Sequence, residues 1–162
     1  MQRTATTTAE AIKQQKPFKT VRQEATVAML ITTETVRRRI VDFLASTGKD
    51  QVTMQQYNVL RILRGSEGEG LPTLAIAERM MEKTPGITGM IDRLQAKGLV
   101  EREHSTHDRR QIVCHITKAG LALLKKLDEP ISSLDEATLS CLNDKEARQL
   151  IELLDRIRNH NN

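Results

Sequence analysis

Three consecutive charged residues, Asp108, Arg109 and Arg110, stand in a polar segment between two short runs rich in apolar residues. The first run starts at Leu99 and the second at Gln111, and together they predict two strands joined by a polar turn. An arginine at the tip of such a hairpin has the shape and charge to enter the narrow, electronegative minor groove of duplex DNA. A carboxylate beside two arginines can hold one guanidinium by charge-assisted hydrogen bonds while the other reaches outward. For any single arginine, a solvated turn with a local ion pair is the alternative.

A second set of polar residues precedes the hairpin, on a predicted helix that closes at Gly98. Thr84 followed by Pro85 is a favourable helix start, because threonine caps the first turn and proline lacks the amide that would have no partner there. Four apolar residues at helical spacing form the side that we expect to be buried: Ile87, Met90, Ile91 and Leu94. The opposite side is small and polar and carries Pro85, Thr88, Gly89, Asp92 and Arg93. Small residues let a helix amino end approach a phosphate, and Thr88 and Arg93 can reach base edges in a major groove; plain exposure to water is the alternative.

The elements before this helix are predicted to support it. An apolar stripe at three- and four-residue steps predicts a long helix from Val21 to near Gly48, and Arg37, Arg38 and Arg39 on it are expected to be solvated or ion-paired. A second helix is expected to start at a capping box of Thr53 with Gln56 and to end at Gly65. Leu71 and Pro72 hint at a short edge strand, and Thr73 is expected to cap the next helix.

The carboxyl-terminal third contains no candidate catalytic or ligand-binding residues, and we expect it to form a dimer interface. Thr117 is expected to cap a helix that Pro130 should bend or interrupt unless the helix yields there. Asn143 with Glu146 reads as a capping box that opens a last amphipathic helix. The third is slightly acidic, with 6 Lys and Arg against 8 Asp and Glu in residues 119–162, so we do not expect it to meet an anion.

The composition restricts the possible functions. A chain of 162 residues suits one domain, and a net charge of +4 with a pI of about 9.3 permits a polyanionic partner without requiring one. The first residues do not resemble a secretory signal, and no apolar segment approaches the length of a membrane span, so we expect a cytoplasmic protein with no membrane partner. We find no nucleophile, base and orienting group at a motif spacing and no glycine-rich phosphate loop, so an enzyme is not expected and no cofactor is predicted.

Metal binding and redox sensing are weaker readings of the same chain. His104, His107, Cys114 and His115 could approach one another across the hairpin, but neighbouring residues of a strand point to opposite faces, which makes a tetrahedral zinc site awkward. We therefore predict no metal site. For the two thiols, Cys114 and Cys141, buried and inert cysteines are favoured over a redox sensor.

Three segments resemble the MarR family of bacterial winged helix-turn-helix regulators. They are IAERM at 76–80, ITGMIDRLQAKGLVERE at 87–103 and, most specifically, DRRQIVCHITKAG at 108–120. The resemblance implies that the helix from Thr84 to Lys97 is the recognition helix and that Thr84, Thr88, Gly89 and Arg93 face the major groove. It also implies that residues 108–110 form the wing motif, with Arg110 in preference to Arg109 in the minor groove and Asp108 positioning it. Gly86 and Gly89 replace the larger polar residues common in the family, which favours backbone approach and DNA shape over base contacts.

The resemblance and the residue patterns together predict a mainly α fold with a small β-hairpin wing. We expect a weakly structured arm at residues 1–19 and a single domain at 20–162, in which 53–117 form the winged helix-turn-helix lobe and 20–47 and 118–160 the dimerisation helices. The predicted function is that of a homodimeric, sequence-specific regulator, released from a palindromic operator in double-stranded DNA by a small-molecule effector that binds between the dimerisation helices and the lobe. The alternative is a protein-interaction module on a winged-helix scaffold without specific DNA binding.

Overall fold

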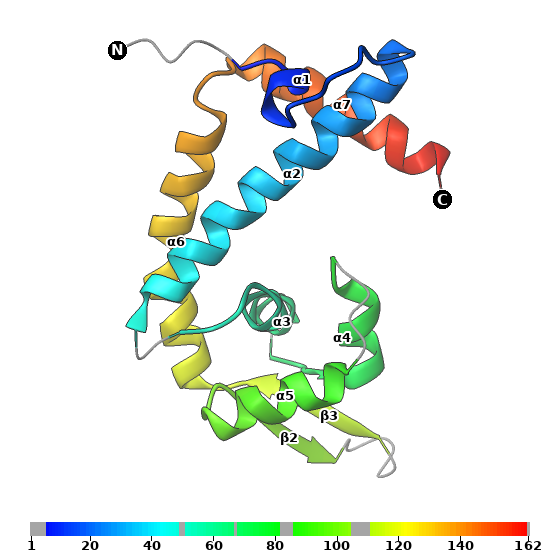
Figure 1. Cartoon of the computed structure of the whole chain (residues 1–162). Coiled ribbons are helices and arrows are strands. Elements are labelled where there is room, and N and C mark those ends of the chain that lie inside the picture. The colour runs from blue at the N-terminus through cyan, green and yellow to red at the C-terminus, as the bar shows by residue number, and fades with distance from the viewer. Residues whose placement is uncertain (1–5, 49–50, 67, 82–85, 105–110, 162) are drawn as a thin grey trace. The chain divides into compact units, whose positions relative to one another are not determined.

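The computed structural model describes residues 6–48, 51–66, 68–81, 86–104 and 111–161 (Figure 1). The chain divides into two compact units, residues 1–42 and residues 43–162. The first unit contains a short helix, α1 (Thr8–Ala11), and most of the long helix α2 (Val21–Ser46). Helix α2 begins at the predicted residue, and Arg37 and Arg38 on it pair with Glu34 at 2.8 and 3.5 Å, which confirms the expectation of local ion pairs there.

The second unit contains the remaining helices and a small antiparallel sheet. Its elements are α3 (Met54–Arg64), β1 (Leu71–Pro72), α4 (Thr73–Arg79), α5 (Ile87–Ala96), β2 (Val100–His104), β3 (Ile112–Ile116), α6 (Lys118–Leu139) and α7 (Asp144–His160). The strand order is β1-β3-β2, so the two-residue strand β1 extends the β2–β3 hairpin through Leu71, which pairs with Cys114. This mostly helical fold with a small antiparallel sheet confirms the predicted fold class.

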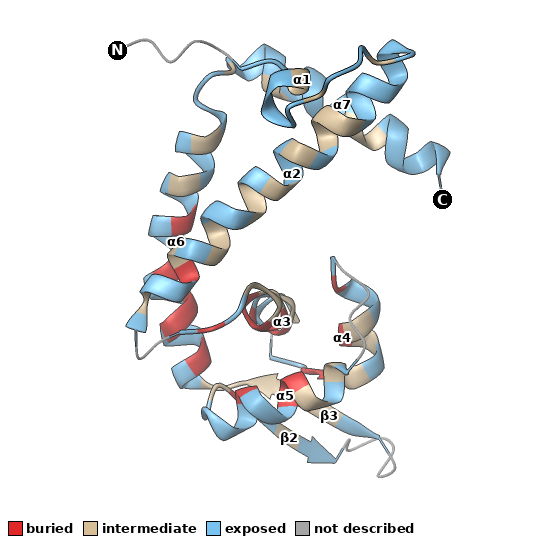
Figure 2. Ribbon diagram, in the orientation of Figure 1, coloured by how far each residue is buried: buried red, intermediate tan, exposed pale blue. Residues whose placement is uncertain are grey.

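The core of the second unit lies where α3, α4, α5 and α6 meet the sheet, as the buried segments in Figure 2 show. Its fully buried side chains come from every one of these elements: Leu60, Leu63, Ile76, Ile91, Leu94, Val100, Cys114 and Leu124. The predicted buried stripe of α5 is confirmed at Met90, Ile91 and Leu94, whereas its first member, Ile87, is only half-buried. An ion pair of 2.8 Å between Arg64 and Asp128 also joins α3 to α6.

Local capping signals in the sequence are confirmed at three helices. Thr53 and Gln56 form the capping box of α3, and Asn143 and Glu146 form that of α7. Thr117 caps α6 by accepting a hydrogen bond from the amide of Gly120 at 3.1 Å. Each of these interactions spans only a few residues, which is why the sequence alone reveals it.

Other boundaries correct the sequence predictions. Thr73 does not cap α4 but is its first residue, and Pro72 holds the N-cap position without a side-chain hydrogen bond. The N-cap of α5 is Gly86, whose φ of 88° lies in the left-handed region that glycine adopts without a steric penalty. Because a left-handed residue cannot continue a right-handed helix, α5 begins at Ile87. The predicted cap Thr84 and the predicted first residue Pro85 lie outside the described residues.

Two further expectations in the carboxyl-terminal part are also corrected. Helix α6 runs unbroken through Pro130, which is exposed, so water can solvate the backbone carbonyl that loses its amide partner. Cys114 is fully buried as expected, but Cys141 is exposed, since it lies in the short connection between α6 and α7.

Helix α7 leaves its apolar side uncovered. None of its residues is buried, and Leu150, Ile151, Leu153 and Ile157 are between 37% and 58% exposed. Within the part of the chain that the structure describes, no helix is long and apolar enough to cross a membrane.

Candidate DNA-binding surface

Helix α5 presents a polar face because its apolar face is used by the core. Met90, Ile91 and Leu94 are 8% exposed or less, whereas Thr88 and Arg93 on the other side are exposed. Gly89 lies between Thr88 and Met90 and is half-buried. The helix therefore offers solvent the polar face that the sequence predicted.

The side chain of Arg93 lies back along this face toward the amino end of α5. Its Nε donates a hydrogen bond of 2.9 Å to the carbonyl of Gly89, one turn earlier. A methyl group on Gly89 would lie 3.9 Å from Nη2 of Arg93, an ordinary van der Waals distance. The guanidinium thus already lies over the amino-terminal half of the helix, where small residues leave the backbone open.

Arg102 on β2 joins the wing sheet to α5, a role that our sequence reasoning missed. Its Nη1 lies 2.5 Å from Oδ1 of Asp92, and its Nη2 donates a hydrogen bond of 3.2 Å to the carbonyl of Thr88. Desolvation lowers the pKa of Arg102, but the hydrogen bond to Asp92 and the negative charge of that carboxylate oppose the shift, and the net pKa is raised. The guanidinium is therefore a fixed cation.

The wing is a regular hairpin as far as the described residues extend. Strands β2 and β3 pair antiparallel from Val100 with Ile116 to His104 with Ile112. Of the predicted site residues, Thr88, Gly89 and Arg93 lie together on α5, whereas Thr84, Pro85, Asp108, Arg109 and Arg110 lie outside the described residues.

Thr117, the N-cap residue of α6, forms two hydrogen bonds with the segment that leads into β2 at the base of the wing. Thr117 donates from Oγ1 to the carbonyl of Gly98 at 2.7 Å and from its amide to the carbonyl of Leu99 at 3.1 Å. A Cβ on Gly120 would overlap the carbonyl oxygen of Leu99 and approach the side chain of Ile116. The glycine of the sequence TKAG is therefore required by close packing, which the sequence pattern alone could not reveal.

On the other side of the sheet, His115 connects β3 to Gly68 and Gly70, which precede β1. Its Nδ1 lies 3.2 Å from the carbonyl oxygen of Gly68, and a Cβ on Gly70 would overlap its ring. Nε2 is buried and lies 2.9 Å from a carboxylate oxygen of Glu103, in a geometry that does not form a hydrogen bond.

The described residues do not assemble a metal site. They contain no group of three or more His, Cys, Asp or Glu side chains placed to hold an ion, and the candidate His107 lies outside them. Cys114 is fully buried and lies 3.9 Å from the hydroxyl of Thr73, while His115 approaches the loop carbonyl of Gly68.

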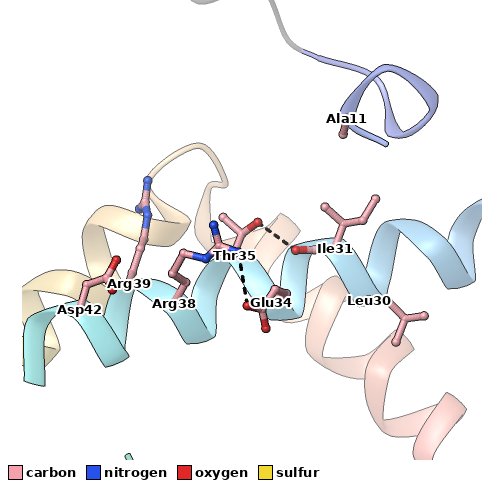
Figure 3. A pocket seen from close by; sticks show the side chains of 8 residues that line it. All are labelled: Ala11, Leu30, Ile31, Glu34, Thr35, Arg38, Arg39 and Asp42. Atoms are coloured by element: carbon pink, nitrogen blue, oxygen red, sulfur yellow. Dashed lines mark hydrogen bonds and ion pairs between the residues drawn. The ribbon is translucent and has the colours of Figure 1, made fainter. Parts of the chain in front are cut away.

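The first unit contains a separate, open hollow of about 630 Å³ between α1 and α2 (Figure 3). It is lined by Ala11, Leu30, Ile31, Glu34, Thr35, Arg38, Arg39 and Asp42. A hydrogen bond from Arg37, together with the charges of Arg37 and Arg38, lowers the pKa of the Glu34 carboxyl group although desolvation opposes the shift. The hollow therefore combines aliphatic side chains with charged ones, of which Glu34 and Arg38 form an ion pair of 3.5 Å.

Comparisons with known proteins agree with this architecture. A model of the MarR family matches residues 52–112. A solved MarR transcription factor from Planctomyces limnophilus is 37% identical, with a TM-score of 0.63 over 86% of this chain and 98% of that chain. MdtR, an HTH-type transcriptional repressor of Bacillus subtilis (strain 168), is 34% identical over 108 residues, which are 67% of this chain and 68% of MdtR.

A third comparison supports the fold alone. The structure of S. aureus MepR in complex with DNA has a TM-score of 0.73 at 18% identity and covers 83% of this chain and 96% of that chain. The chain spans slightly less than two thirds of two further curated relatives: 66% of a protein of Thauera aromatica described as a putative transcriptional regulatory protein for the hcr operon, and 64% of the uncharacterized HTH-type transcriptional regulator YfiV of Bacillus subtilis (strain 168). Transcription regulators of the MarR family are DNA-binding proteins without enzymatic activity. The helix-turn-helix with its attached hairpin and the similarity to MdtR and to the Planctomyces protein show that this chain belongs to the MarR family of transcriptional regulators.

Proposed function

We propose that this regulator is a homodimeric, sequence-specific repressor that acts in the cytoplasm on a palindromic operator. The residues of the winged helix-turn-helix lobe, 53–117, would place α5 in the major groove and the wing in the adjacent minor groove. The observation that carries the proposal is that the exposed polar face of α5 is fixed directly to the first strand of the wing, through Arg102, Asp92 and Thr88. Because α5 and the wing are held at a fixed spacing, they could enter the major groove and the adjacent minor groove at the same time.

The amino end of α5 suits close approach to DNA. Thr88 and Arg93 supply donors for base edges or phosphate oxygens, and Gly86 and Gly89 allow the backbone to come near. We assign Thr84 and Pro85 to the same contact surface because they directly precede this end in the chain.

The wing arginines supply the second contact. Residues 108–110 belong to the segment that connects β2 to β3, and an arginine there suits the negative potential of a narrow minor groove. We assign insertion to Arg110, and orientation of its guanidinium to Asp108 through a charge-assisted hydrogen bond. Arg109 would then contact the backbone.

Dimerisation is supported by the uncovered apolar side of α7. Exposed residues such as Ile151 and Ile157 gain stability when a second copy covers them, because burial removes apolar surface from water. A twofold dimer presents two recognition helices and therefore requires two related half-sites about one DNA turn, ~34–36 Å, apart.

Repression is suggested by two relatives. MdtR is a repressor, and a 27% identical relative from Escherichia coli is the repressor of a homoprotocatechuate degradative operon. An effector can act only if it binds the DNA-competent and the released states with different affinities. The hollow beside Glu34 and Arg38 is a candidate for its site.

The test is a salt series of binding to duplex DNA from the promoter region of the protein's own gene, with a random duplex of equal length beside it. Each phosphate that is neutralised contributes about −0.9 to the slope of log affinity against log salt, so a steep slope with a preference for the promoter duplex supports the proposal. Arg110→Ala is expected to weaken binding and reduce the slope. Lys125→Ala, which removes an exposed cation from α6, is the matched control and should change neither. Binding no tighter than to random duplex would overturn the proposal in favour of a protein-interaction module.

A further inference from the structure

Arg102 connects two elements that the chain joins at one end only. Helix α5 ends at Ala96 and β2 begins at Val100, so the covalent connection lies at the carboxyl end of the helix. The opposite end of α5 and the far end of β2 are the ends assigned to the two DNA grooves. Without a further link, nothing in the covalent chain fixes the distance between them.

In addition to the apolar packing of α5 against β2 in the core, the guanidinium of Arg102 links the two elements. It contacts one turn of α5 at two points, the Asp92 carboxylate at 2.5 Å and the Thr88 carbonyl at 3.2 Å. The side chain is 22% exposed, and its planar fork can hold two acceptors at a set angle. A Lys at this position could supply the charge but not the two-point geometry.

From this geometry we infer that Arg102 is a positioning residue for DNA binding: it fixes the spacing between the recognition helix and the wing, so that the major-groove and minor-groove contacts form together. The inference rests on the proposed function. According to this inference, the Arg102–Asp92 pair increases the affinity for DNA without touching the DNA. Asp92 then favours binding although its negative charge lies beside the DNA-binding surface.

A direct role for Arg102 makes opposite predictions. If Arg102 instead bound a phosphate, Asp92 would compete for its guanidinium and repel the DNA. Asp92→Asn would then tighten binding. In the positioning role, Asp92→Asn weakens binding, although it removes a charge that repels DNA. Glu101→Gln is the matched control, because Glu101 is an exposed carboxylate on the same strand, away from Arg102 in the alternating pattern.

The experiment measures the affinity of the full chain for the promoter duplex in Asp92→Asn, Glu101→Gln, Arg102→Ala, Arg110→Ala and the double variant Arg102→Ala/Arg110→Ala. The positioning role predicts a loss of about three- to tenfold for Asp92→Asn and for Arg102→Ala, and no loss for Glu101→Gln; these factors correspond to coupling energies typical of interacting residues. It also predicts that Arg102→Ala costs little affinity once Arg110 is already replaced.

Additive losses in the double variant, or tighter binding by Asp92→Asn, would each overturn the inference while leaving the proposed function intact. If the unaltered chain shows no preference for the promoter duplex, the proposed function fails and the inference fails with it. Thermal melting of each variant checks folding, and the mild Asp92→Asn change keeps the test decisive if Arg102→Ala does not fold.

Discussion

Two helical glycines lie in opposite surroundings, and replacing each with alanine is expected to change stability in opposite directions. In α6, a Cβ on Gly120 would overlap the carbonyl oxygen of Leu99 and lie 2.7 Å from Cγ1 of Ile116. The Leu99 carbonyl cannot easily move, because it accepts a hydrogen bond of 3.1 Å from the amide of Thr117. In α5, by contrast, the nearest atom to a Cβ on Gly89 lies 3.9 Å away.

The magnitudes follow from two terms. Alanine in a helix interior is favoured over glycine by about 0.5–1 kcal/mol, and this gain applies to both positions. Overpacking against groups that cannot retreat costs about 1–3 kcal/mol, and this cost applies only to Gly120. For Gly120→Ala, an overlap cost near the upper end of that range, less the helix gain, lowers the free energy of unfolding by about 2 kcal/mol. For Gly89→Ala, the helix gain alone raises the free energy of unfolding by about 1 kcal/mol.

Thermal and urea denaturation of both variants at one protein concentration measures these changes. For a chain of this length the expected shifts are about 4–8 °C downward for Gly120→Ala and about 2–4 °C upward for Gly89→Ala. The concentration must be fixed because the midpoint of the proposed dimer would depend on it. A Gly120→Ala variant as stable as the unaltered protein would refute the packing explanation of the TKAG sequence, and a destabilised Gly89→Ala would refute the description of that face as open.

Three further predictions follow from capping, dimerisation and titration. Thr53→Ala removes the capping box of α3 and should lower the free energy of unfolding by about 1 kcal/mol in urea; an unchanged midpoint would show that the cap contributes nothing. Ile151→Asp on α7 should shift sedimentation from dimer to monomer, whereas Gln149→Asp on the polar side should not; equal behaviour of the two variants would contradict α7 as the interface. The pKa of Glu34, measured by NMR, should lie below its ordinary value of 4.5 and return toward it in Arg37→Ala, because the hydrogen bond from Arg37 favours the carboxylate. Since the folded-state pKa is lowered, the pair stabilises the fold above pH 4.5 and loses that effect as the pH falls through the lowered pKa; a pKa unaffected by Arg37→Ala would contradict the assignment.

The sequence predicted the features that depend on residues close together in the chain. The capping boxes at Thr53 and Asn143 span four residues each, and the buried stripe of α5 follows helical periodicity, so both were predicted correctly. Pro130 was expected to interrupt α6 because the penalty for proline is local, but the helix packs against α3 and the sheet on its other side and continues.

The features that the sequence did not reveal depend on contacts between distant elements. Arg102 meets Asp92 only because β2 folds back along α5, a spacing of ten residues with no periodic signal. Gly120 is required only because the carbonyl of Leu99 comes close to α6. The start of α5 was misplaced because Thr84 and Pro85 are an ordinary helix start, whereas the left-handed backbone of Gly86 is not visible in the residue type alone. At the candidate site, the three residues on α5 were predicted, and the residue that attaches the wing to them was not.

The central claim, that two copies of α5 enter successive major grooves with the wings in the flanking minor grooves, is tested most directly by chemical footprinting on the promoter duplex. Methylation of guanine N7 marks the major groove, and hydroxyl-radical cleavage reports on the minor groove and backbone. We predict two regions in which N7 methylation blocks binding, centred about 10–10.5 base pairs apart, each flanked on its outer side by protection from hydroxyl radicals that is lost in Arg110→Ala. A single region of interference, or protection that is indifferent to Arg110, would contradict the account.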